Sequence, residues 1–148
     1  MQRSTIALAL AGMVGAVAGA EDARLLQAGE YAVRVRLELP HVEDTGAATK
    51  VDSICVTAGD AGTHGLAALG DGNPLRKCPA FNVRHDGPSL TFDIVCPGSD
   101  AAVGAAKYTM RADSFEAAIA VKMGGKNMTM IERQSGHRVG RCKSQPRS

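Results

Sequence analysis

The sequence has few aromatic residues, no tryptophan and almost no net charge. Five of its 148 residues are aromatic, and 17 Lys and Arg stand against 15 Asp and Glu. Proteins that bind nucleic acid usually have a basic surface and aromatic side chains on which bases stack. The chain has neither, so we do not expect it to bind nucleic acid or an anionic membrane surface. Its 45% hydrophobic and 22% charged residues are otherwise typical of a folded globular protein.

Long hydrophobic runs are absent after the amino-terminal residues. Residues 5–18 carry no charge, follow Arg3, and lead into an Ala-Gly-Ala that ends at residue 20. This order is typical of a cleaved signal peptide, and the stretch is too short and too rich in Ala and Gly for a transmembrane anchor. We therefore expect residues 1–20 to be removed. The mature protein is then periplasmic and has no transmembrane segment.

The mature chain has about 128 residues, enough for one domain with a modest core. Without Arg3 its net charge is +1, from 16 basic against 15 acidic residues. We expect a single β domain over residues 21–143 and a disordered tail over residues 144–148.

The four cysteines are Cys55, Cys78, Cys96 and Cys142, and no two of them form a Cys-x-x-Cys motif. Zinc and redox motifs are therefore poorly supported. An even number of cysteines in a short exported chain predicts disulfides, and four cysteines allow three pairings.

Local geometry selects one pairing. A turn around Gly87 separates two alternating runs, residues 78–84 and 89–96. A three-residue loop centred on Gly87 pairs residues whose numbers add to 174, and Cys78 and Cys96 satisfy this condition. Cys55 and Cys142 then pair by elimination, closing most of the chain into a loop worth about 4 kcal/mol of stability.

Hydrophobic residues recur with period two along most of the mature chain, which is typical of half-buried strands. Besides the two runs around Gly87, alternation marks residues 31–39, 51–57, 105–112 and 115–123. We expect an antiparallel meander of six to seven strands that forms a curled sheet, half-barrel or small sandwich. The glycine-rich residues 58–74 lack alternation, and we expect at most one helical turn there, at residues 66–69.

The final hairpin has a predicted register. A two-residue turn at Gly124-Gly125 would place Val121 opposite Met128 and Ile119 opposite Met130. The same register would pair Glu116 with Arg133 on the other face.

Several short motifs resemble a known family. They are Gly29-Glu30-Tyr31, the Cys78 and Cys96 spacing, Met128-Thr129-Met130, and the Gly-x-Arg-x-Gly-x-Cys pattern that ends at Cys142. In this order they resemble the DUF3617 family of small exported bacterial proteins, over about residues 29–142. The resemblance implies an exported protein whose function is not established, and it offers no catalytic residues.

No residue pattern predicts catalysis or a cofactor. The four histidines, His41, His64, His85 and His137, lie in expected turns or loops, and none has a second histidine at ligand spacing. The chain has no Gly-x-Ser-x-Gly nucleophile motif and no phosphate-binding loop. We expect a protein that is not an enzyme and has no catalytic residues, metal site or cofactor.

Two functions fit these observations. We expect an interaction or structural module that binds an unknown envelope protein through a sheet face or edge. The alternative is a module that holds a small apolar ligand, or less favourably a soft metal, on the concave face of the sheet. The residues that would line this face are Phe115, Ile119, Val121, Met128 and Met130. A filled interior with an exposed apolar patch would favour the partner, and an open interior would favour the ligand.

Overall fold

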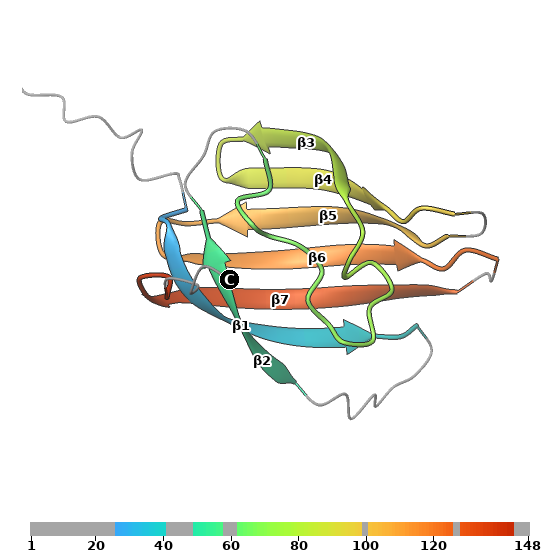
Figure 1. Ribbon diagram of the computed structural model, residues 1–148, viewed down its shortest axis with the longest axis horizontal. Coiled ribbons are helices and arrows are strands. Elements are labelled where there is room, and N and C mark those ends of the chain that lie inside the picture. Colours follow the sequence, from blue (N-terminus) through green and yellow to red (C-terminus); the bar gives the residue numbers. More distant parts are fainter. Residues whose placement is uncertain (1–25, 41–48, 58–61, 99–100, 126–127, 144–148) are drawn as a thin grey trace, which may run out of the picture.

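The computed structural model describes residues 26–40, 49–57, 62–98, 101–125 and 128–143. Within them the chain forms seven β-strands and no helix (Figure 1). The strands are β1 (Gly29–Glu38), β2 (Lys50–Val56), β3 (Ala80–Asp86), β4 (Ser89–Val95), β5 (Val103–Met110), β6 (Ser114–Lys122) and β7 (Thr129–Gly140).

All seven strands form one antiparallel sheet in the order β2-β1-β7-β6-β5-β4-β3. Strands β3 to β7 follow one another as a meander, and β7 then pairs with β1. The predicted antiparallel, curled β fold is confirmed, as one sheet and not as a sandwich. Among the described residues β2 and β3 are the edge strands and do not pair, so the sheet is not closed.

The connection between β2 and β3 crosses one face of the sheet from edge to edge (Figure 1). We call residues 62–79 the crossover segment and the face that it covers the inner face. Leu66 and Ala68 are buried against the sheet and alternate with half-buried neighbours. This period of two belongs to an extended chain. The helical turn predicted at residues 66–69 is therefore wrong.

The core lies between the inner face and the crossover segment. Four aromatic rings form a continuous chain across it, with centroid distances of 5.9 Å from Tyr31 to Phe115, 5.6 Å from Phe115 to Tyr108 and 5.6 Å from Tyr108 to Phe92. A glycine makes this packing possible, because a Cβ atom at Gly136 would lie 2.4 Å from the Phe115 ring. The few aromatic residues of the chain are thus concentrated in its core.

Both predicted disulfides are present, Cys55–Cys142 and Cys78–Cys96, with Cα–Cα distances of 5.4 and 4.8 Å. The geometry behind the second one differs from the prediction. The β3–β4 turn contains two residues, Gly87 and Pro88, because Asp86 pairs with Ser89. A bulge between Phe81 and Arg84 then shifts the register by one residue, which brings the cysteines opposite each other.

The predicted register of the β6–β7 hairpin is wrong by two residues. Val121 pairs with Met130 and Glu116 with Ser135. The connection is longer than two residues, because the Met123 amide donates to the Met128 carbonyl at 2.9 Å. A shift of two residues preserves which side chains share a face, so the predicted faces are correct.

The predicted Glu116–Arg133 pair does not form as a consequence. Arg133 instead donates to the Glu38 carboxylate at 3.2 Å, across the β1–β7 pairing.

Candidate functional site

Four of the five predicted ligand-binding residues come together on the inner face. Phe115, Ile119, Val121 and Met130 are buried in the core cluster on this face. Met128 lies outside β7 and is 49% exposed, so it does not join them. The inner face is packed with the chain's own side chains, including Leu66 and Leu75 of the crossover segment.

A buried carboxylate fastens the crossover segment to the sheet. Glu132 of β7 is 0% exposed. Its carboxylate accepts hydrogen bonds from the backbone amides of Leu69 at 2.7 Å and Gly70 at 3.0 Å. It also accepts from Asn73 Nδ2 at 2.6 Å and Gln134 Nε2 at 2.7 Å. Four donors satisfy this buried carboxyl group, so Glu132 attaches the crossover segment to β7.

Gln134 and Tyr108 extend this hydrogen-bond network to Ala67. We call Glu132, Gln134 and Tyr108 the polar clamp. Gln134 Nε2 donates to the Ala67 carbonyl at 2.8 Å, and the Tyr108 hydroxyl lies 3.1 Å from both the Ala67 oxygen and Gln134 Oε1. Burial raises the pKa of Tyr108, and the nearby Glu132 carboxylate raises it further. The sequence carries one signal of the clamp, since polar residues, Glu132 and Gln134, follow Met130 on the inward-facing side of β7.

The opposite, outer face of the sheet is open to solvent and carries an apolar groove of about 560 Å³. Its hydrophobic side chains come from β4 to β7, and Val95 and Val103 are 40% and 41% exposed. Phe81, on the outer face of β3, is 48% exposed. We call this feature the outer apolar groove; its apolar side chains on that face are Val95, Val103, Ala105, Ala120 and Ile131.

A second groove, of about 530 Å³, lies beside it on the same face. Around it are four basic and two acidic side chains, and we call it the outer basic groove. The charged residues are Arg34, Arg36, Glu38, Lys107, Glu116 and Arg133. Pairing places Arg36 directly opposite Arg133, with Ala118 between Arg133 and Lys107 in the same row. Like charges placed opposite each other destabilise a sheet, and the Glu38 carboxylate, 3.2 Å from Arg133 Nε, offsets part of this repulsion.

The structure brings together two histidines that are far apart in the sequence. The rings of His64 and His85 lie 5.0 Å apart, centroid to centroid. His137 lies on the outer face of β7, away from them, and His41 lies outside the described residues. In the described part of the chain no three His, Cys, Asp or Glu side chains are grouped so that they could hold a metal ion.

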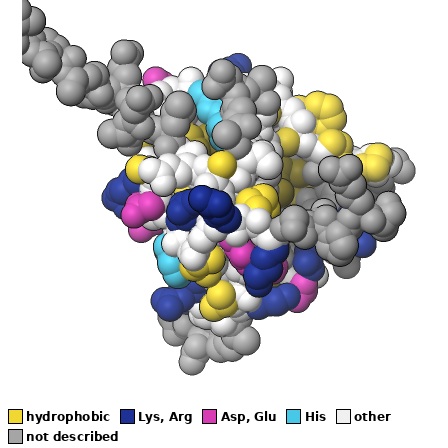
Figure 2. All heavy atoms as spheres, turned by 60° about the vertical axis from the view of Figure 1, so that its left-hand side comes forward, with side chains coloured by type: hydrophobic (Ala, Val, Ile, Leu, Met, Phe, Trp, Pro, Cys, Tyr) yellow, Lys and Arg dark blue, Asp and Glu magenta, His cyan; other side chains and the backbone are white. Residues whose placement is uncertain are grey.

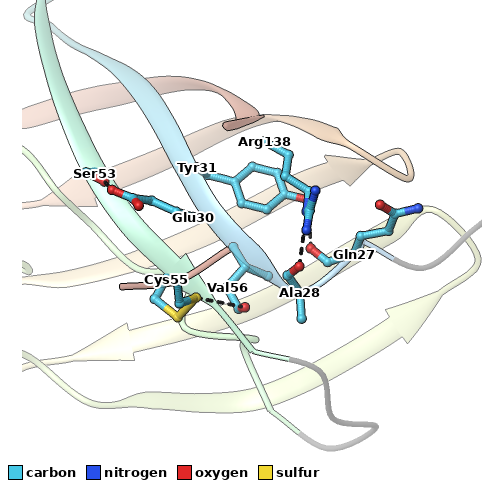
Figure 3. Close-up of a disulfide and its surroundings, with 9 residues drawn as sticks. Gln27, Ala28, Glu30, Tyr31, Ser53, Cys55, Val56 and Arg138 are labelled. Atoms are coloured by element: carbon cyan, nitrogen blue, oxygen red, sulfur yellow. Dashed lines mark hydrogen bonds between the residues drawn. A yellow bond between two sulfur atoms is a disulfide. The ribbon is translucent and has the colours of Figure 1, made fainter. Parts of the chain in front are cut away.

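The end of the sheet near Cys55–Cys142 is held by hydrogen bonds to the chain before β1 (Figure 3). The Tyr31 hydroxyl donates to the Gln27 carbonyl at 2.8 Å, and Arg138 Nε donates to the Ala28 carbonyl at 3.1 Å. Burial raises the pKa of Tyr31, while the Arg138 charge lowers it in part. Figure 2 turns this end forward and shows basic, acidic and hydrophobic side chains interspersed on it.

The match to a family model covers residues 26–142 and carries the description "Protein of unknown function (DUF3617)". The chain belongs to the DUF3617 family. The matched residues include all seven strands and all four cysteines of this DUF3617 protein, so the family pattern spans the whole sheet. No curated protein and no solved structure matches the chain significantly. Among the residues that the structure describes, no helix is long and apolar enough to cross a membrane.

Proposed function

We propose that this DUF3617 protein is an exported, non-enzymatic interaction module whose outer sheet face binds a partner protein. One observation carries the proposal. The crossover segment fills the inner face, whereas the outer face exposes an apolar groove with partly exposed valines. Contiguous exposed apolar surface on a small soluble domain is typical of an interaction site.

Export is supported by the two disulfides, because such bonds persist in oxidising compartments. Together with the signal-peptide pattern at residues 1–20, they favour the periplasm. The partner is then a protein of the envelope.

The two outer grooves define the chemistry of this partner. Ala105 and Ala120 form a flat centre, since their small side chains allow a partner to approach the strands closely. Arg36, Arg133 and Lys107 lie in the adjacent row. We infer a partner surface with an apolar centre flanked by carboxylates, because such charge complementarity fixes orientation and speeds association.

Site-specific photo-crosslinking in the exporting cells tests the proposal. A photoreactive residue is placed at Val103 or Ala120 in the outer apolar groove. Matched controls carry it at Arg76 or Lys77, which are exposed on the crossover segment and not on the outer face. We expect one discrete crosslinked protein from the groove positions and none from the controls. Equal crosslinking from all four positions, or none at all, would reject the outer face as the binding surface.

Purified components then test the inferred chemistry. Val103→Asp should abolish binding of the crosslinked partner, and Lys107→Glu should weaken it and reduce its dependence on salt. Unchanged affinity in both variants would refute the apolar and anionic character that we assign to the partner.

A small apolar ligand on the inner face is the alternative function. It would have to displace Leu66 and Leu75, which are buried in the same core cluster as Ile119. Native mass spectrometry of protein purified from the periplasm tests this alternative. A discrete added mass that is lost on denaturation would support the ligand, and a clean apo mass would leave the partner protein as the better proposal.

A further inference from the structure

We propose that His64 and His85 form a binding site for a divalent transition metal ion, with Cu(II) bound more tightly than Zn(II). The two residues come from opposite edges of the sheet. His64 lies in the connection that leaves β2, and His85 lies on the edge strand β3. Their ring centroids are 5.0 Å apart and their planes are inclined by 82°. The proposal is independent of the partner proposed for the outer face.

The spacing of the two rings suits a shared metal ion. Imidazole nitrogen binds Zn²⁺ at about 2.0–2.1 Å, so two histidines on one tetrahedral ion have ring centroids roughly 5 Å apart. His85 is exposed and His64 half-buried, so an ion can reach both rings and water can complete its coordination.

Hydrogen bonds select the ring nitrogens that would bind the ion. His64 Nδ1 lies 3.2 Å from the Thr57 carbonyl oxygen, and His85 Nε2 lies 3.0 Å from the Gly62 carbonyl oxygen. A carbonyl oxygen only accepts, so in neutral imidazoles these two nitrogens carry the hydrogens. The lone pairs are then on Nε2 of His64 and Nδ1 of His85.

This arrangement is the one that metal-binding histidines use. Their second ring nitrogen usually donates to a backbone carbonyl or a carboxylate, which fixes the tautomer and makes the first nitrogen a stronger ligand. An edge-to-face contact between the two rings would explain the distance between them. It would not explain why a backbone carbonyl lies within hydrogen-bond distance of one nitrogen of each ring.

The backbone at His64 supports a fixed ring position. Its φ angle is 55°, in the left-handed region that histidine adopts more often than most residues. The Thr57 amide also donates to the His64 carbonyl at 3.0 Å. Residues 57 and 64 are therefore held together by backbone and side chain, and the His64 ring is presented toward β3.

The experiment uses tag-free protein purified after export and stripped of metal with a chelator. Cu(II) is titrated in and followed by calorimetry and by electron paramagnetic resonance. We expect one ion per chain and a spectrum that shows nitrogen ligation from two imidazoles. His85→Gln and His64→Gln should each weaken binding at least about tenfold, since even loss of a supporting outer-shell partner costs that much.

Matched controls separate this site from other copper ligands. His137→Gln removes a histidine from the outer face and should leave the affinity unchanged. His85→Phe keeps an aromatic ring against His64 but supplies no nitrogen ligand, so this variant should not bind the ion. Its circular dichroism spectrum should match that of the wild type, which would show that the fold is retained. The position of His85 on an exposed edge strand keeps the test valid if His64→Gln fails to fold.

Two results would overturn the proposal. One is the absence of saturable Cu(II) binding to the wild-type protein. The other is an affinity that His85→Gln and His85→Phe leave unchanged, which would assign the ion to ligands elsewhere in the chain.

Discussion

The Glu132 carboxylate accepts the backbone amide of Leu69 at 2.7 Å, although 63 positions separate the two residues. This bond joins the last strand of the sheet to the crossover segment. Together with the bonds from Gly70 and Asn73 it attaches the middle of the crossover segment to this one carboxylate.

Replacing this side chain should destabilise the protein strongly. Glu132→Ala removes the acceptor of the Leu69, Gly70 and Asn73 donors and one of the two bonds of the Gln134 amide, and each buried group left unsatisfied costs about 1–3 kcal/mol. We expect the free energy of unfolding to fall by at least about 3 kcal/mol in urea denaturation. The control is Glu116→Ala on the exposed face, which should change stability by less than about 0.5 kcal/mol. Equal effects of the two variants would contradict the role of the clamp.

Glycine at position 136 should be required for the aromatic core. A Cβ atom there would lie 2.4 Å from the Phe115 ring, whereas a Cβ atom at Gly140 on the same strand would have no atom within 4 Å. Overpacking a core costs about 1–3 kcal/mol, so Gly136→Ala should lower the free energy of unfolding by that amount. Gly140→Ala should leave it nearly unchanged. Calorimetric melting of the two variants provides the comparison, and a stable Gly136→Ala protein would show that the ring can move aside.

The two disulfides should contribute unequally to the free energy of unfolding. Cys55 and Cys142 are 87 positions apart, and Cys78 and Cys96 are 18 apart. The chain-entropy model assigns the longer loop about 4.6 kcal/mol and the shorter loop about 3.2 kcal/mol. Alanine replacement of each pair, followed by denaturant unfolding, should therefore show the larger loss for Cys55–Cys142. A larger loss for Cys78–Cys96 would mean that local structure, and not loop length, dominates.

Alkaline pH should weaken the fold through Tyr108. Burial raises its pKa above the value of 10.0 that it has in an unfolded chain. Stability is then fully present below pH 10 and declines above it, as the unfolded state loses a proton that the folded state keeps. One such group contributes a slope of about 1.4 kcal/mol per pH unit.

Tyr108→Phe isolates the contribution of this hydroxyl to the pH dependence of stability from the contributions of all other groups. The variant loses the contacts to Ala67 and Gln134 and is less stable at neutral pH. Its stability should nevertheless decline less steeply than that of the wild type between pH 10 and 11. Parallel declines in urea unfolding would show that Tyr108 does not govern the alkaline limit.

Local patterns in the sequence predict most of the sheet. Alternation in β1 predicts that Tyr31, Val33 and Val35 share the buried face, because successive strand residues point to opposite sides. The Cys78–Cys96 pairing also follows from a local turn. Two errors in that argument cancel, since a shorter turn and a bulge at Asn82 together restore the expected register.

Features that depend on distant residues could not be predicted. The glycine-rich residues 62–79 show no hydrophobic alternation in the sequence, and their path depends on bonds to Glu132 and Gln134, 63 and 67 positions after Leu69 and Ala67. To predict the outer apolar groove and the His64–His85 contact, one must know the order of the strands in the sheet as well as the face on which each residue lies. A one-dimensional pattern assigns a residue to a face, and only the register decides its neighbours.

The pairing of β1 with β7 determines when the chain can finish folding. The first strand has no partner toward the centre of the sheet until the last strand is present, and the clamp that seals the inner face also belongs to that last strand. In a chain that crosses a membrane amino terminus first, β1 therefore stays without its β7 partner during most of the crossing. Its core can close only after residues 129–140 have emerged.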